Sequence, residues 1–216
     1  MAIIKAEDFV DAMYEAYNRE ESKPAKDAMA QILINSRMLA MGKRPICQDT
    51  GVVCVFVKVG MDAKLDNTSR TIIELVNEGV KKGYANEHNL LRASMVFPLD
   101  SARKNTKDNT PAIVHIDLVH GDKIGIDIAA KGGGSEFKSK FKVLNPSDSV
   151  ADWVEEMLPT MGAGWCPPGI LGIGIGGTSE KAMILAKESL SEKINMQDII
   201  KNGPQNETEE LRLDIF

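Results

Sequence analysis

The sequence is poor in cysteine and in aromatic residues, and no long apolar segment interrupts it. It has three Cys, six Phe, three Tyr and two Trp among 216 residues. So few thiols argue against a disulfide framework and for reduced, cytosolic cysteines. No apolar stretch reaches the ~18–20 residues of a membrane-spanning helix, and the N-terminus lacks the basic-then-apolar pattern of a secretory signal. We therefore expect a cytoplasmic protein with no membrane partner.

Charge of one sign is not in excess either. The formal net charge is −5, from 26 basic and 31 acidic side chains. Without a basic surplus, neither nucleic acid nor an acidic membrane surface is indicated as a partner. Hydrophobic residues make up 43% of the chain and charged residues 26%. This is the balance of an ordinary globular protein, long enough to bury a core without disulfides or metals.

Helical and strand patterns follow one another irregularly. Apolar residues recur at helical spacing in five segments, namely ~6–19, Pro24 to Gly42, ~68–82, ~149–161 and the segment after Thr178. The run Val52–Val59 is nearly continuous and β-branched, which predicts a strand buried on both faces. Residues 112–130 alternate around His120-Gly121-Asp122, which is typical of a β-hairpin. We expect a single α+β domain over residues 1–216, with a mixed or antiparallel sheet flanked by helices.

Two of the cysteines stand in segments suited to chemistry. PICQDTG places Cys47, Gln48 and Asp49 in a polar turn between a helix and the buried strand, where a rigid scaffold often presents a site. In GWCPPGI, Cys166 precedes two prolines, which stiffen the chain after the thiol as is frequent at iron–sulfur ligands. For both cysteines the alternative is a small buried thiol in an ordinary turn or rigid loop. Cys54, inside the apolar strand, is interpreted as a core residue.

A lone arginine and two glycine-rich segments are further candidates. Arg92 lies in the otherwise apolar LLRASMV, where a guanidinium is costly unless it meets a ligand carboxylate or a structural ion-pair partner. The run Gly132–Gly134 suits either close backbone approach to an anion or a flexible hairpin loop. Gly172–Gly177 fits the GxGxxG pattern of nucleotide-binding turns, in a segment that predicts a short apolar strand, a glycine turn and then a helix. The acidic residue at the required distance, Asp198, follows a polar helical segment instead of a strand, which makes this signal weak.

Several blocks of the sequence, in fixed order, resemble the alpha region of the class I fumarase and tartrate-dehydratase family of iron–sulfur hydro-lyases. The blocks are AKDAMAQILINSRMLAMGKRPICQDTGVV, LLRASMV, RKNTKDNTPA, AKGGGSEFKS and MGAGWCPPGILGIGIGGTSEKAM. The resemblance covers nearly the whole chain, and the pairing of PICQDTG with GWCPPGI is its most specific part. It implies a [4Fe–4S] cluster held by three cysteines, with one iron open to substrate. It also implies that Cys47 and Cys166 are two of these ligands.

The resemblance implies roles for neighbouring residues and a reaction. Gln48 and Asp49 are implied to face the substrate, with Asp49 as the catalytic acid or base. Arg92 is implied to bind a substrate carboxylate, and Gly133 or Gly134 to contact substrate through the backbone. The reaction implied is the reversible hydration of fumarate to (S)-malate, or the matching reaction of tartrate or a similar dicarboxylate.

The sequence differs from the family pattern in what it does not contain. The family's third cysteine belongs to a later block, and neither that block nor the family's beta region is present in these 216 residues. We therefore expect an excised N-terminal domain, or else one piece of a split enzyme, that is inactive alone. It would assemble with the C-terminal or beta region as a homodimer or heterodimer. A nucleotide-binding module built on Gly172–Gly177 and a non-catalytic scaffold domain are the alternatives.

Overall fold

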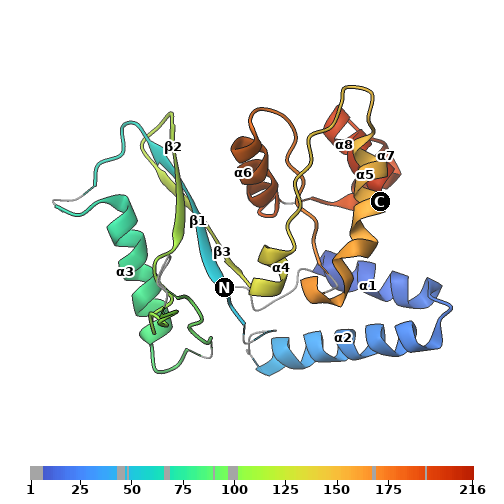
Figure 1. Ribbon diagram of the computed structural model, residues 1–216, viewed down its shortest axis with the longest axis horizontal. Helices are drawn as coiled ribbons and strands as arrows, with labels where there is room; N and C mark the ends of the chain where they lie inside the picture. Colours follow the sequence, from blue (N-terminus) through green and yellow to red (C-terminus); the bar gives the residue numbers. More distant parts are fainter. Residues whose placement is uncertain are drawn as a thin grey trace. The chain divides into compact units, whose positions relative to one another are not determined.

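A computed structural model describes residues 7–42, 47, 49–65, 69–89, 91–96, 102–166, 169–192 and 194–216. The chain divides into two compact units, Met1–Gly133 and Gly134–Phe216, and each is considered by itself. Helices combine with a mixed sheet, so the predicted α+β class is confirmed (Figure 1). That residues 1–216 make one domain stays a prediction. Within the described ranges, no helix has the length and apolar character that crossing a membrane requires.

The first unit begins with two antiparallel helices, α1 (Glu7–Arg19) and α2 (Lys23–Gly42), which lie against each other (Figure 1). Glu20 closes the short connection, because its Oε1 accepts the N–H groups of Glu21 at 2.9 Å and Ser22 at 2.8 Å. Both helices are predicted by the periodicity of the sequence, and α2 ends at Gly42 as predicted.

The sheet of the first unit is built around one apolar strand. Its strands within the described residues are β1 (Val52–Gly60), β2 (Ile113–Val119) and β3 (Ile124–Lys131), in the order β2-β1-β3. Residues 53–57 of β1 are all buried, as predicted for a strand covered on both faces. Helix α3 (Ile72–Ala85) supplies part of that cover, since Val76 and Val80 pack against the valines of β1. It starts where Thr71 and Glu74 form a reciprocal capping box.

The predicted hairpin over residues 112–130 is wrong in its pairing. Both strands exist, but β1 lies between them, parallel to β2 and antiparallel to β3. The connecting turn crosses the end of β1, where the Gly60 N–H donates to the carbonyl of Lys123 at 2.8 Å. A Cβ on Gly60 would lie 2.3 Å from the Gly121 carbonyl oxygen, so the crossing needs glycine there. In the central place both edges of β1 pair with a neighbour, which satisfies the backbone N–H and C=O groups that a strand buried on both faces hides from water.

The second unit is helical. Its elements are α4 (Gly133–Phe137, starting at the boundary of the units), α5 (Val150–Met157), the 3₁₀ helix η1 (Leu158–Trp165), α6 (Ser179–Ser189), α7 (Met196–Asn202) and α8 (Glu207–Ile215). The Ser149 side chain caps α5 by accepting the Asp152 N–H at 3.1 Å. The buried residues Val154 and Met157 lie on α5, which packs against η1 and α8. The helix predicted over ~149–161 is thus α5 continued by η1.

The GxGxxG segment is packed on a helix, and the short apolar strand predicted there is absent from the described residues 169–175. A Cβ on Gly172 would lie 2.1 Å from the Ala186 carbonyl oxygen, and one on Gly174 would lie 2.0 Å from that of Ala182. The two glycines therefore let the chain lie directly on the backbone of α6. This packing explains the glycine pattern without a nucleotide.

Candidate functional site

Asp49 lies in the turn before β1, and backbone groups hold its carboxylate from two directions. Oδ1 accepts the N–H of Gly51 at 3.0 Å, and Oδ2 accepts the N–H of Gly133 at 3.1 Å. The first bond closes a local turn of the kind that Asp favours. The second bond joins this turn to the segment that follows β3. Because a carboxylate offers about four lone-pair positions, Asp49 keeps capacity to accept a further partner.

At Gly51 these two segments lie too close together for a side chain. Its φ is +52°, a conformation that residues with a Cβ rarely adopt. A Cβ on Gly51 would also lie 2.0 Å from the carbonyl oxygen of Lys131 and 2.8 Å from the nitrogen of Gly133. Glycine is therefore required both for the backbone conformation and for the contact.

The segment that carries Arg92 runs beside Asp49. The two residues form an isolated parallel bridge, and the buried Thr50 donates its hydroxyl to the carbonyl of Arg92 at 3.0 Å. The Arg92 side chain is exposed and forms no ion pair with any residue that the structure describes. Within that part of the chain, the interpretation of Arg92 as one half of a structural ion pair is therefore not supported. Its guanidinium can bind a ligand anion.

A fully buried amide, that of Asn109, ties the same segments together. Its Oδ1 accepts the N–H groups of Ser94 at 2.9 Å and Met95 at 3.0 Å. Its Nδ2 donates to the carbonyl of Gly51 at 3.2 Å. Sequence reasoning missed this residue, because nothing in RKNTKDNTPA distinguishes its amide from that of Asn105. The one available signal is that Asn tolerates the left-handed conformation that position 109 adopts, with φ +60°.

In the second unit, Cys166 ends η1 in a left-handed conformation, with φ 63° and ψ 57°. Its thiol is exposed. Gly134 lies beside it, since a Cβ there would stand 2.8 Å from the Cys166 Sγ and 2.7 Å from the Gly164 carbonyl oxygen. Glycine at position 134 is therefore what lets the backbone lie directly against the thiol and the Gly164 carbonyl. The Gly-rich segment around it begins the short helix α4 and is not the flexible hairpin loop considered as the alternative.

The other predicted site residues fall in different places. Cys47 is an exposed free thiol of the first unit, whereas Cys54 is buried in β1 as predicted. Exposure of Cys47 and Cys166 excludes the interpretation of either as a small buried filler. Gln48 lies outside the described residues. The structure thus brings Asp49, Arg92 and Gly133 together in the first unit and places Gly134 beside Cys166 in the second.

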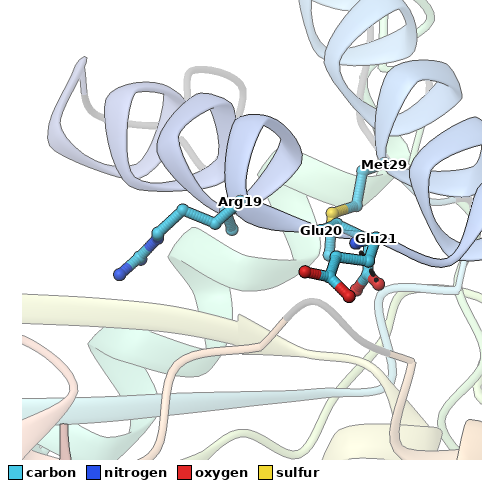
Figure 2. Close-up of a pocket in the computed structure, with 5 residues that line it drawn as sticks. Arg19, Glu20, Glu21 and Met29 are labelled. Atoms are coloured by element: carbon cyan, nitrogen blue, oxygen red, sulfur yellow. Dashed lines mark hydrogen bonds between the residues drawn. The ribbon is translucent and has the colours of Figure 1, made fainter.

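A pocket at the corner between α1 and α2 does not suit an anionic substrate. Figure 2 shows the residues that line it, which are Ala16, Arg19, Glu20, Glu21 and Met29. Two glutamates and one arginine make its charged lining acidic on balance, and a dicarboxylate is repelled by such a lining. None of the predicted site residues belongs to it.

Comparison with known proteins identifies the class of this chain as a hydro-lyase subunit. The family described as fumarate hydratase (fumerase) matches residues 1–216. The chain therefore belongs to the class I fumarate hydratase and tartrate dehydratase alpha-subunit family. The predicted resemblance is confirmed over the whole chain.

Curated relatives support the same family, and their names refer to tartrate dehydratase. The putative L(+)-tartrate dehydratase subunit alpha of Methanocaldococcus jannaschii is 39% identical over 199 residues, which cover 89% of this chain and 69% of the relative. The L(+)-tartrate dehydratase subunit alpha of Escherichia coli K12 is 28% identical over 211 residues, covering 96% and 68%. A relative of the same name from Shigella sonnei has the same identity and coverage. Each of these proteins is named as a tartrate dehydratase and not as a fumarase.

The family uses an iron–sulfur cluster, and the donor chemistry of this chain fits such a group. Two exposed thiols, those of Cys47 and Cys166, are the ligand type that such clusters take. Cys54 adds no third thiolate, because β1 buries it. Over the described ranges, no three His, Cys, Asp or Glu side chains are grouped to hold a metal ion.

Proposed function

We propose that this chain is the alpha-type subunit of a [4Fe–4S] hydro-lyase that removes water from a four-carbon hydroxydicarboxylate. The observation that carries the proposal is the meeting of Asp49, Arg92 and Gly133 at the start of β1. L(+)-tartrate is the first candidate substrate, since the relatives are named for it. Reversible hydration of fumarate to (S)-malate is the second, since the family description names fumarate hydratase.

The residues at this turn match what the reaction needs. Dehydration breaks a C–O and a C–H bond on neighbouring carbons and leaves a C=C bond, so a proton must be removed from carbon. Asp49 is the proposed acid or base, held in place by two backbone N–H groups. Such proton transfer typically contributes ~10²–10⁴-fold to the rate. Arg92 is proposed to bind one substrate carboxylate, because a planar guanidinium donates two parallel hydrogen bonds to it.

Cys47 and Cys166 are the proposed thiolate ligands of the cluster. When bound, the cluster supplies a Lewis-acidic iron for the departing hydroxyl group. Gly133 is proposed to act through Asp49, to which its N–H is already donated at 3.1 Å. Gly134, whose lack of a side chain lets its backbone lie against Cys166, is the proposed backbone contact to substrate. Gln48 stays a predicted substrate contact.

The proposed site is incomplete in this chain. Two thiolates do not complete a three-cysteine site, so the chain is expected to be inactive alone. The relatives are named subunit alpha, which supports a beta-type partner that contributes the remaining substrate contacts. Assembly would follow as a homodimer or heterodimer, in the cytoplasm, where thiols stay reduced.

The test uses the complete assembly after anaerobic reconstitution with iron and sulfide. Loss of water from tartrate yields the enol of oxaloacetate, and hydration of fumarate yields malate, so the two products are assayed separately. The proposal predicts turnover of at least one substrate, with the higher kcat/KM for L(+)-tartrate. A cluster-loaded assembly that turns over neither contradicts it. Activity that survives Cys166→Ala would favour the scaffold alternative.

A further inference from the structure

We propose that Asn109 is a positioning residue, whose buried side chain fixes the Arg92 segment against the Asp49 turn. The reaction it serves is that of the proposed function, on which this inference rests. Neither the family resemblance nor the relatives assign a role to this residue. Its contacts lie entirely within the first unit.

The Asn109 amide forms hydrogen bonds with two segments that are far apart in the sequence. It is 0% exposed, and an amide buried without partners would destabilise the folded protein. The two N–H groups of Ser94 and Met95 require an oxygen at Oδ1, and the carbonyl of Gly51 requires the NH₂ group. These partners fix the orientation of the amide. The side chain therefore acts as a link between the two segments and not as a local turn bond.

The position demands asparagine for two independent reasons. Its φ of +60° favours Gly or Asn over residues with branched side chains. Its surroundings demand both an acceptor and a donor at the end of a short side chain. Aspartate would satisfy the N–H groups of Ser94 and Met95 but would turn a carboxylate oxygen toward the carbonyl of Gly51. Glycine would satisfy the backbone conformation but provide no link.

Thr50 and Asn109 bind successive residues of the segment that carries Arg92. The hydroxyl of Thr50 binds the Arg92 carbonyl at 3.0 Å. Asn109 then holds the N–H groups two and three residues further along, and Asn105 donates to the Ala93 carbonyl at 3.0 Å. Gly51, the third partner of Asn109, is the residue whose N–H binds the Asp49 carboxylate. The Ser94 hydroxyl also donates to the Gly51 carbonyl, at 3.4 Å. Among these links the Asn109 amide is the fully buried one, and it helps to set the spacing between the proposed substrate-binding cation and the proposed proton-transfer group.

The first test compares Asn109→Gly with Lys107→Gly in the complete, cluster-loaded assembly. Both replace a left-handed residue of one loop, but Lys107 is exposed and its side chain forms no hydrogen bond or ion pair with the described residues 91–96. Because a misplacement of about 1 Å can cost ~10²-fold in rate, Asn109→Gly is expected to lower kcat/KM about 100-fold. The loss should divide between a higher KM, from Arg92, and a lower kcat, from Asp49.

If Asn109 only stabilised the fold, the folded, cluster-loaded variant would show neither the higher KM nor the lower kcat. Kinetics are therefore measured well below the melting temperature of each variant and at equal cluster content per chain. Lys107→Gly should stay within about twofold of the unaltered enzyme. If folded, cluster-loaded Asn109→Gly keeps the kcat and KM of the unaltered enzyme, the inference is overturned. Should Asn109→Gly not fold, Asn109→Asp replaces it. A loss of about tenfold is expected from its single unmatched oxygen, and no loss overturns the inference.

Hydrogen exchange separates failure of this inference from failure of the proposed function. An assembly that turns over neither tartrate nor fumarate refutes the proposed function but leaves the link measurable. In Asn109→Gly the amides of Ser94 and Met95 should exchange at least about tenfold faster, whereas those of Val55 and Val57 in β1 should be unchanged. Unchanged protection of Ser94 and Met95 would overturn the positioning role whatever the enzyme does.

Discussion

At the scale of single residues, side-chain oxygens bound to backbone N–H groups set the geometry at the start of β1. Asp49 accepts from Gly51 and Gly133, and Asn109 accepts from Ser94 and Met95. Each of these bonds crosses a turn or joins two segments, so each side chain fixes a spacing that backbone pairing alone leaves open. Changes at these positions should therefore affect activity more than overall stability.

The proton-transfer role predicts the effect of Asp49→Asn. The amide has the same shape but only one oxygen for two N–H donors, so the free energy of unfolding should fall by about 1–2 kcal/mol. The kcat of the complete assembly should fall by ~10²–10⁴-fold, because an amide does not accept the substrate proton. Steady-state kinetics and urea unfolding measure the two effects. Asp62→Asn, in an exposed turn after β1, is the matched control, and a kcat loss under tenfold in Asp49→Asn would argue against the role.

Asp108 supports the loop that carries Asn109, and it does so in a pH-dependent way. The hydroxyl of Thr110 donates to Oδ1 at 2.7 Å. This bond, more than the Thr110 N–H or the Lys81 cation, holds the pKa of Asp108 below its ordinary value of 3.8, although partial burial opposes the shift. A carboxyl whose pKa is lowered by folding stabilises the folded state above its unfolded pKa. That stabilisation is lost as the pH falls through the folded pKa.

This pH dependence of stability predicts the behaviour of Thr110→Val, which removes the hydroxyl and keeps the shape of the side chain. The variant should lose about 1 kcal/mol of unfolding free energy at pH 7, where Asp108 is ionised. The difference should shrink as the pH falls through the lowered pKa of Asp108, because the carboxyl then protonates in both proteins. Urea unfolding at pH 7 and near pH 2 measures it. An equal loss at both pH values would show that the bond to the carboxylate is not the source.

At the scale of elements, the sequence predicts where strands and helices lie in the chain better than it predicts which elements pair or pack with one another. The alternation in residues 112–130 correctly indicates two strands joined by a tight turn, but pairing depends on what lies between them. Here β1, a strand from an earlier part of the chain, pairs with both of them, and the alternation within residues 112–130 contains no information about it. The glycines at 172 and 174 gave a similar ambiguity, because close packing on a helix and binding of a pyrophosphate both require a missing Cβ.

The crossing of the β2–β3 turn over the end of β1 predicts contrasting effects for two strand glycines. In Gly60→Ala the new Cβ would lie 2.3 Å from the Gly121 carbonyl oxygen, so backbone must shift. The expected loss of unfolding free energy is about 2–4 kcal/mol. In Gly125→Ala the Cβ meets only the Lys58 Cβ, at 3.8 Å, so stability should be unchanged or rise by up to about 1 kcal/mol. Equal losses in urea unfolding would contradict the crossing.

At the scale of the whole molecule, the sequence predicts the type of site better than it predicts the hydrogen bonds that hold the site together. The two turn cysteines and the polar PICQDTG turn stand out by composition, and the family blocks attach roles to them. The links that shape the turn do not stand out, since Asn109 and Asn105 look alike in RKNTKDNTPA and only burial distinguishes them. Contacts between residues far apart in the chain, such as Asp49 with Gly133, are invisible to local patterns.

The central claim is that Cys47 and Cys166 bind the cluster. Its most direct measurement is the iron and sulfide content, with the visible absorbance, of the complete assembly after anaerobic reconstitution. Cys47→Ser and Cys166→Ser should each lose most of the cluster, because an alcohol is a poor replacement for a thiolate ligand. Cys54→Ala, in the buried β1, should lower stability and keep the cluster. An unchanged cluster in either serine variant would contradict the claim.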